Sequence, residues 1–178
     1  MWDKKKLSSH AITRMALLMA AALILSWVEA ILPFQIPVPG VKLGFANIVL
    51  LFVLYGNSFP TALCFGVLRA LLSGLFLGRL SGVLFSLGGT VLALCGMALL
   101  KKCRCFSPLG VSMAGAVLHG VGQLTVAALL LTPGVLSLLP LMGISSAACG
   151  AVIWVPFRIL SRYEGILLPK RPKNMNKD

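Results

Sequence analysis

Seven polar or ionisable side chains interrupt the long apolar segments of this chain, and their types favour binding chemistry. They are Glu29, Lys42, Asn47, Arg69, Arg79, His119 and Gln123. A charged group at membrane depth is costly to hold and by default indicates a functional site. Three cations accompany a single carboxylate, so the set carries surplus positive charge. This surplus suits an anionic ligand group such as phosphate or carboxylate, to which arginine gives paired hydrogen bonds.

Purely structural roles for the same side chains stay open. Glu29 and Arg69 would serve packing alone if they formed a buried ion pair. Basic groups near the helix ends would have a structural role alone if they reached lipid headgroups. His119 and Gln123 would have a structural role alone if they made a hydrogen bond between helices. We expect at least part of the set to bind a ligand, because otherwise every one of these side chains would have to be purely structural.

The apolar runs that carry these residues are long enough to cross a lipid bilayer. The chain is 58% apolar and 11% charged, whereas a soluble domain of this length needs more polar surface. A membrane-spanning helix takes about 20 apolar residues. We therefore predict an all-α integral membrane protein in one domain, residues 1–178, with short basic tails at 1–10 and 163–178. Its six helices are expected near residues 12–32, 43–55, 58–77, 80–100, 109–131 and 135–160.

Prolines and glycines separate these runs, because proline cannot continue a helix and glycine favours turns. The second run is short, which indicates either a tilted helix or a re-entrant one that is shielded by protein. The fifth run is expected to stop at Pro133. Pro140 and Pro156 are expected to kink or end the sixth run.

Basic residues cluster on one side of the predicted bundle and set its orientation. They gather at residues 4–6, 101–104 and 158–177. Cytoplasmic loops are enriched in Lys and Arg, so both termini are predicted to be cytoplasmic in a multi-pass protein of the cell membrane. The net charge of +12 does not form the continuous basic face of a nucleic-acid-binding protein, and no nucleic-acid partner is expected.

With this orientation the candidate residues lie between the membrane midplane and the outer surface. Glu29 and Asn47 are expected near the outer ends of their helices. Arg69 is about 16 Å from the inner start of its helix, at 1.5 Å per residue. His119 is expected near mid-depth, with Gln123 one turn further out on the same face. Together they predict a polar cavity that opens to the outside.

Motifs for catalysis are missing from the sequence. Both aspartates, Asp3 and Asp178, lie at the chain ends, whereas prenyl-transferring enzymes hold Mg²⁺-diphosphate with aspartate-rich motifs. No triad, paired acids or glycine-rich ATP loop is present. The five cysteines have neither disulfide-framework nor metal-ligand spacing. We therefore expect neither catalysis nor a cofactor.

Several segments of the chain resemble the Gx transporter family, which is also labelled heptaprenyl diphosphate synthase component I. The most specific segment is PGVKLGFAN, residues 39–47. Others are residues 16–29, 68–78, 86–89 and 115–131, the last of which contains His119 and Gln123. The resemblance covers residues 11–160. It implies a six-helix protein similar to the substrate-binding S components of energy-coupling-factor (ECF) vitamin transporters.

Two functions follow from this resemblance, and the sequence leaves both open. The first is a transport subunit that captures a small, anionic or partly polar molecule from the extracytoplasmic side. S components bind a shared transmembrane coupling subunit and its two ATPases through small residues on the first helix, and Ala16 and Ala20 match that pattern. The second is a non-catalytic membrane accessory of isoprenoid or menaquinone synthesis, bound to a cytoplasmic prenyl synthase subunit.

Overall fold

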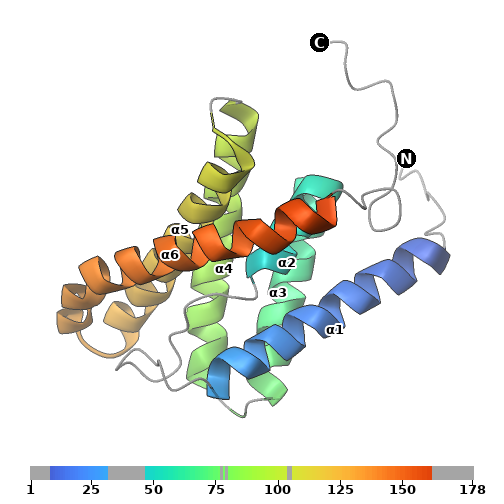
Figure 1. The fold of residues 1–178 in the computed structure, drawn as a ribbon. Helices are drawn as coiled ribbons and strands as arrows, with labels where there is room; N and C mark the ends of the chain where they lie inside the picture. The colour runs from blue at the N-terminus through green and yellow to red at the C-terminus, as the bar shows by residue number, and fades with distance from the viewer. Residues whose placement is uncertain (1–8, 32–46, 77, 79, 104–105, 162–178) are drawn as a thin grey trace, which may run out of the picture.

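The computed structural model describes residues 9–31, 47–76, 78, 80–103 and 106–161, and in this part of the chain the regular structure is helical. Lys42, Arg79, residues 1–8 and the predicted C-terminal tail lie outside the described residues, whereas residues 9 and 10 of the predicted N-terminal tail begin α1. The described residues form six α-helices, which Figure 1 labels, and one short 3-10 helix, η1. They are α1 (Ser9–Ile31), α2 (Asn47–Gly56), α3 (Phe59–Phe76), α4 (Leu80–Cys103), α5 (Pro108–Leu130), η1 (Pro133–Leu138) and α6 (Leu139–Ser161).

Consecutive helices from α3 to α6 pack against one another, with the closest association between α4 and α5. Glycines permit this approach, because a Cβ atom built on Gly122 of α5 would lie 2.6 Å from the carbonyl oxygen of Gly88 on α4. Small residues of this kind let membrane helices approach backbone to backbone. Helix α1 lies at the side of the molecule in Figure 1, where it packs on α2 and α3.

Five of the described helical segments are long and apolar enough to cross a membrane: Ser9–Ile31, Phe59–Phe76, Ser81–Cys103, Pro108–Leu130 and Pro133–Val152. The shortest of them has 18 residues, which is about 27 Å of helix and close to the thickness of a bilayer's hydrocarbon core. The chain is therefore a multi-pass membrane protein. The sequence predicted six spans, and the second of these has a different form.

Helix α2 is a short helix inside the bundle. Its ten residues extend about 15 Å, half of the hydrocarbon thickness. Six successive side chains, from Val49 to Leu54, are all buried. A helix that is apolar on every side must be covered on every side, and α2 meets this condition through contacts with α1 and with α3 to α6. Of the two forms predicted from the sequence, the described part fits a short helix shielded by protein.

Several helix ends differ from the sequence-based prediction. Helix α4 continues through Lys101 to Cys103, so the basic loop begins later than expected. Pro140 is the second residue of α6 and Pro156 lies within it, so neither ends the helix. Proline is compatible with a first helical turn because the N–H groups there have no intrahelical partner. Pro133 does stop the fifth helix, but it opens η1 rather than the sixth helix itself.

Candidate functional site

Buried polar side chains from all six α-helices form the centre of the bundle, and we refer to them as the polar core. Each member is at most 7% exposed. Buried polar groups are costly unless they are hydrogen-bonded or used in binding. The polar core consists of Ser26, Glu29, Asn47, Arg69, Ser73, Ser86, Thr90, Ser112, His119, Gln123 and Ser146. Five of the seven predicted site residues therefore belong to it, and the other two, Lys42 and Arg79, lie outside the described residues.

Arg69 is a buried cation held by neutral hydroxyl groups. Its Nη2 donates to Thr90 Oγ1 at 2.9 Å and to Ser86 Oγ at 3.3 Å. Ser86 and Thr90 are four residues apart and so lie on one face of α4. The Nε–H of Arg69 is fully buried and has no acceptor among the described residues. The guanidinium is therefore fixed in place while one of its donors stays available to an anionic group.

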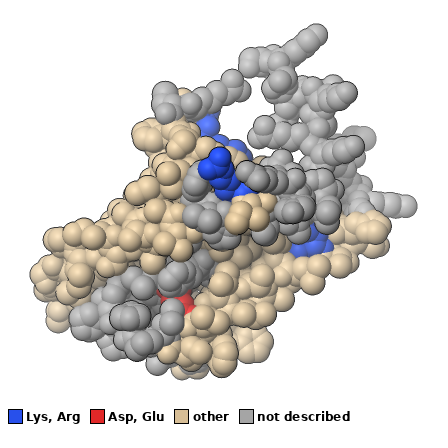
Figure 2. Space-filling view, viewed as in Figure 1, with Lys and Arg blue, Asp and Glu red and all other residues tan. Residues whose placement is uncertain are grey.

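Glu29 stands close to Arg69 and belongs to the same core. It is 6% exposed near the end of α1, and it interacts electrostatically with Arg69 on α3 and with the Cys149 thiol on α6. It is the one acidic residue in the described part of the chain. Figure 2 shows the acidic atoms as a small area, away from the basic residues that gather elsewhere on this face. The direct hydrogen bonds of Arg69 go to hydroxyls, which position the guanidinium, whereas Glu29 acts on its charge through space.

His119 and Gln123 form a pair within α5. The Nε2 atoms of the two side chains are 3.1 Å apart. This contact runs along one helix, because residues four apart are neighbours on a helix face. The pair lies against Gly89 of α4, where a built Cβ would be 2.9 Å from both His119 Cε1 and Gln123 Cγ. A residue larger than glycine would displace these side chains.

Asn47 lies deeper in the bundle than the sequence indicated. Its Nδ2 is 3.4 Å from the position that a Cβ on Gly115 would take. Gly115 is seven residues from the start of α5 and fifteen from its end, or about 10 Å and 22 Å along the helix. Asn47 is therefore nearer the end of the bundle where α5 begins. Asn47 is the first described residue of α2, but α2 begins inside the bundle, and whether this end of α2 faces the outside stays a prediction.

Sequence reasoning missed the serine and threonine members of the polar core. Ser86 and Thr90 hold Arg69, and Ser112 Oγ donates to the Gly150 carbonyl oxygen of α6 at 2.9 Å. Single hydroxyl residues in apolar helices are common, so their presence alone carries little information. The spacing of Ser86 and Thr90 was the available signal, because a four-residue interval aligns two hydroxyls on one face.

The small residues of α1 lie on its free face. Ala16 and Ala20 are exposed, and no described helix covers them. Most large apolar side chains of α1 are exposed beside them, including Leu17, Ile24 and Trp27. This face is therefore directed towards lipid or towards another membrane protein.

The fold and the polar core together define a class of protein: a multi-pass helical membrane protein whose buried polar core contains a cation, Arg69. In the described part of the chain, no three His, Cys, Asp or Glu side chains gather as metal ligands would. A comparison with protein-family models gives a match to Heptaprenyl diphosphate synthase component I over residues 18–158. The chain belongs to this family. Curated proteins and solved structures give no match.

Proposed function

We propose that the chain is a non-catalytic membrane subunit of heptaprenyl diphosphate synthesis, which binds the anionic end of a prenyl diphosphate in its polar core. The observation that carries this proposal is the buried Arg69, whose Nε–H has no acceptor among the described residues. The family to which the chain belongs supplies the substrate class. The apolar surroundings of the core suit an isoprenoid chain.

The charge of the core suits this ligand. A buried cation without a directly bonded counterion is unfavourable, and a diphosphate would supply both charge and acceptor oxygens. Asn47, His119 and Gln123 add polar contacts to the same core, and Glu29 limits how many negative charges it accepts. Lys42 and Arg79 are proposed to add cationic contacts, as the sequence indicated.

The proposal includes a partner and an orientation. A cytoplasmic prenyl synthase subunit would supply the catalytic residues, since the sequence of this chain has no aspartate-rich motif. Both termini are placed on the cytoplasmic side, on the evidence of the basic clusters. The synthase would then meet the basic loop and tail. The whole assembly belongs to the cell membrane.

Binding of farnesyl diphosphate to the purified protein in mild detergent tests the proposal, with farnesol as a ligand that has the same tail and no anion. We expect Arg69→Gln to weaken farnesyl diphosphate binding at least about tenfold, the value of one charge-assisted hydrogen bond, and to leave farnesol binding unchanged. Arg14→Gln is the matched control, because Arg14 is a half-buried arginine of α1 outside the polar core. If Arg69→Gln does not fold, Arg69→Lys takes its place in the test, because lysine keeps the charge. Equal affinity for both ligands would refute the proposal.

A second candidate function is a transport subunit similar to an ECF S component. The observation that favours it is the exposure of Ala16 and Ala20 on the free face of α1. Small residues in this pattern let a second membrane helix approach closely. In this reading the polar core captures a small anionic or partly polar molecule from the extracytoplasmic side, and a coupling subunit with two ATPases drives transport.

Affinity purification from native membranes, followed by mass spectrometry, distinguishes the two functions. Recovery of a coupling subunit with two ATPases, lost on Ala16→Leu and Ala20→Leu, would support transport. Ala148→Leu is the control, because Ala148 is an exposed alanine on α6. Recovery of a prenyl synthase subunit in place of the transport proteins would support the accessory function.

A further inference from the structure

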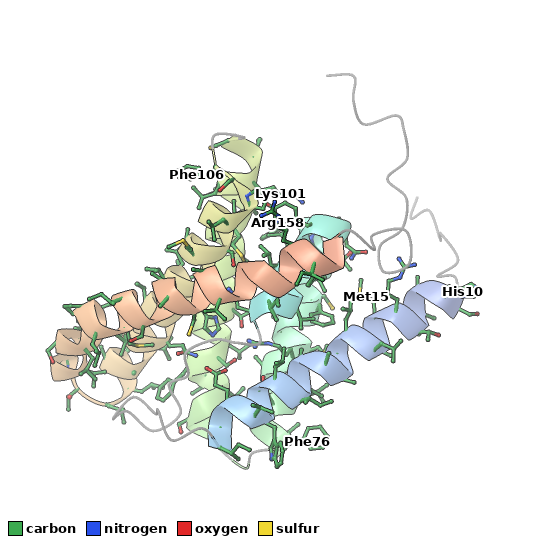
Figure 3. The ribbon with its side chains drawn as sticks, viewed as in Figure 1. His10, Met15, Phe76, Lys101, Phe106 and Arg158 are labelled. Atoms are coloured by element: carbon green, nitrogen blue, oxygen red, sulfur yellow. The ribbon has the colours of Figure 1, made fainter. Side chains whose placement is uncertain are left out.

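Lys101 connects the end of α4 to the short helix α2. It lies in the last turn of α4 and is half-buried, whereas its neighbour Lys102 is exposed. The Lys101 Nζ donates to the Leu54 carbonyl oxygen of α2 at 2.7 Å and lies 4.6 Å from the centroid of the Tyr55 ring. Figure 3 labels Lys101 at the end of the bundle where Arg158 and Phe106 also lie.

This contact satisfies a helix end that needs a partner. The last four carbonyl groups of a helix have no intrahelical donor. At the end of α2, the backbone N–H of Asn57 donates to the Val53 carbonyl oxygen at 2.9 Å, and the Lys101 ammonium donates to the Leu54 carbonyl oxygen. A cation at a helix C-terminus also interacts favourably with the helix dipole. The Tyr55 ring adds a cation–π contact to the same ammonium group.

The other end of α2 is part of the polar core. Asn47 is the first described residue of the helix, it is 3% exposed, and its Oδ1 has no hydrogen-bond partner among the described residues. A helix of ten residues moves as one unit, and α2 is buried on all sides. A displacement at Leu54 would therefore reach Asn47, about 10 Å away along the helix.

We infer that Lys101 is a positioning residue for the polar core: through α2 it holds Asn47 at the depth where its amide meets a bound ligand. The inference rests on the proposed function only for the identity of that ligand. It gives Lys101 a role that the basic cluster around it does not share. The neighbouring Lys102 has the same charge and lies on the exposed surface.

Two measurements on Lys101→Met test this role, with Lys102→Met as the matched control. Methionine keeps a long apolar stem but removes the ammonium group. Because a charge-assisted hydrogen bond is lost, we expect amide hydrogen exchange in residues 48–56 to accelerate about ten- to a hundredfold, with exchange in α4 and α5 unchanged. We also expect farnesyl diphosphate to bind about threefold to tenfold more weakly. Lys101→Arg should restore both values, because arginine donates and stacks on tyrosine in the same way.

Each outcome has a distinct meaning. Faster exchange across the whole bundle in Lys101→Met, or an equal effect of Lys102→Met, would overturn the inference, because the lysine would then act through general stability or surface charge. Unchanged exchange in residues 48–56 would also overturn it. Failure of the wild-type protein to bind farnesyl diphosphate would count against the proposed function alone, since the exchange measurement needs no ligand.

Discussion

Replacement of Gly122 by alanine tests whether backbone contact between α4 and α5 holds the polar core together. A Cβ atom at this position would lie 2.6 Å from the Gly88 carbonyl oxygen and 2.8 Å from the Gly89 Cα. Both neighbours are backbone atoms, which cannot turn aside as a side chain does. An ordinary contact of 3.4 Å then requires the two helices to separate by about 0.8 Å at this level.

The expected cost is the difference between two effects. Overpacking of a well-packed interior costs about 1–3 kcal/mol, and contact with backbone atoms places Gly122→Ala at the upper end. Alanine is favoured over glycine within a helix by about 1 kcal/mol. The net destabilisation is therefore about 2 kcal/mol. Gly143→Ala in α6 is the control, because a Cβ there meets nothing within 4 Å, and it should be stabilising by up to about 1 kcal/mol.

The purified variants are unfolded in mixed micelles by increasing the SDS fraction, and circular dichroism follows the loss of helix. This titration measures the change in unfolding free energy for both variants. The two variants should differ by about 3 kcal/mol in the free energy of unfolding. The separation should also move Gly89 away from His119 and so lower ligand affinity. If Gly122→Ala proved as stable as Gly143→Ala, the close packing of α4 on α5 would not limit stability, and the reasoning would be refuted.

Three further substitutions follow from individual contacts. Thr90→Val removes the 2.9 Å acceptor of Arg69 at nearly constant volume, and we expect a loss of about 1.5–3 kcal/mol with weaker ligand binding, measured by SDS unfolding and a binding titration. Ser107→Ala removes the N-cap of α5, whose side chain accepts from the Gly110 N–H at 3.2 Å; a loss of about 1 kcal/mol should appear in thermal unfolding. Gly78→Ala should cost about 1–2 kcal/mol in the same assay, because its φ of 62° is left-handed; an unchanged melting temperature would show that the turn adapts.

The amino-acid sequence by itself was sufficient to predict an apolar, all-helical membrane protein. Apolar runs of membrane length leave the backbone no other means of satisfying its polar groups within a bilayer. Breaks at Gly56 and Gly78 were correctly located, since a local conformational preference acts at these points. Glu29, Arg69, His119 and Gln123 could be recognised as buried because charged and polar groups stand out against apolar neighbours.

Only the tertiary structure decided how these residues meet. The depth of Asn47 depends on α2 lying within the bundle, which is a matter of packing among six helices rather than of local sequence. The sites of Ser86 and Thr90 opposite Arg69 depend on the rotation of α3 against α4. Lys101 looked like any other basic residue at a membrane surface, yet the fold places its ammonium on the last turn of α2. Side-chain contacts between distant segments are set by helix crossing and close approach, and these are properties of the whole assembly.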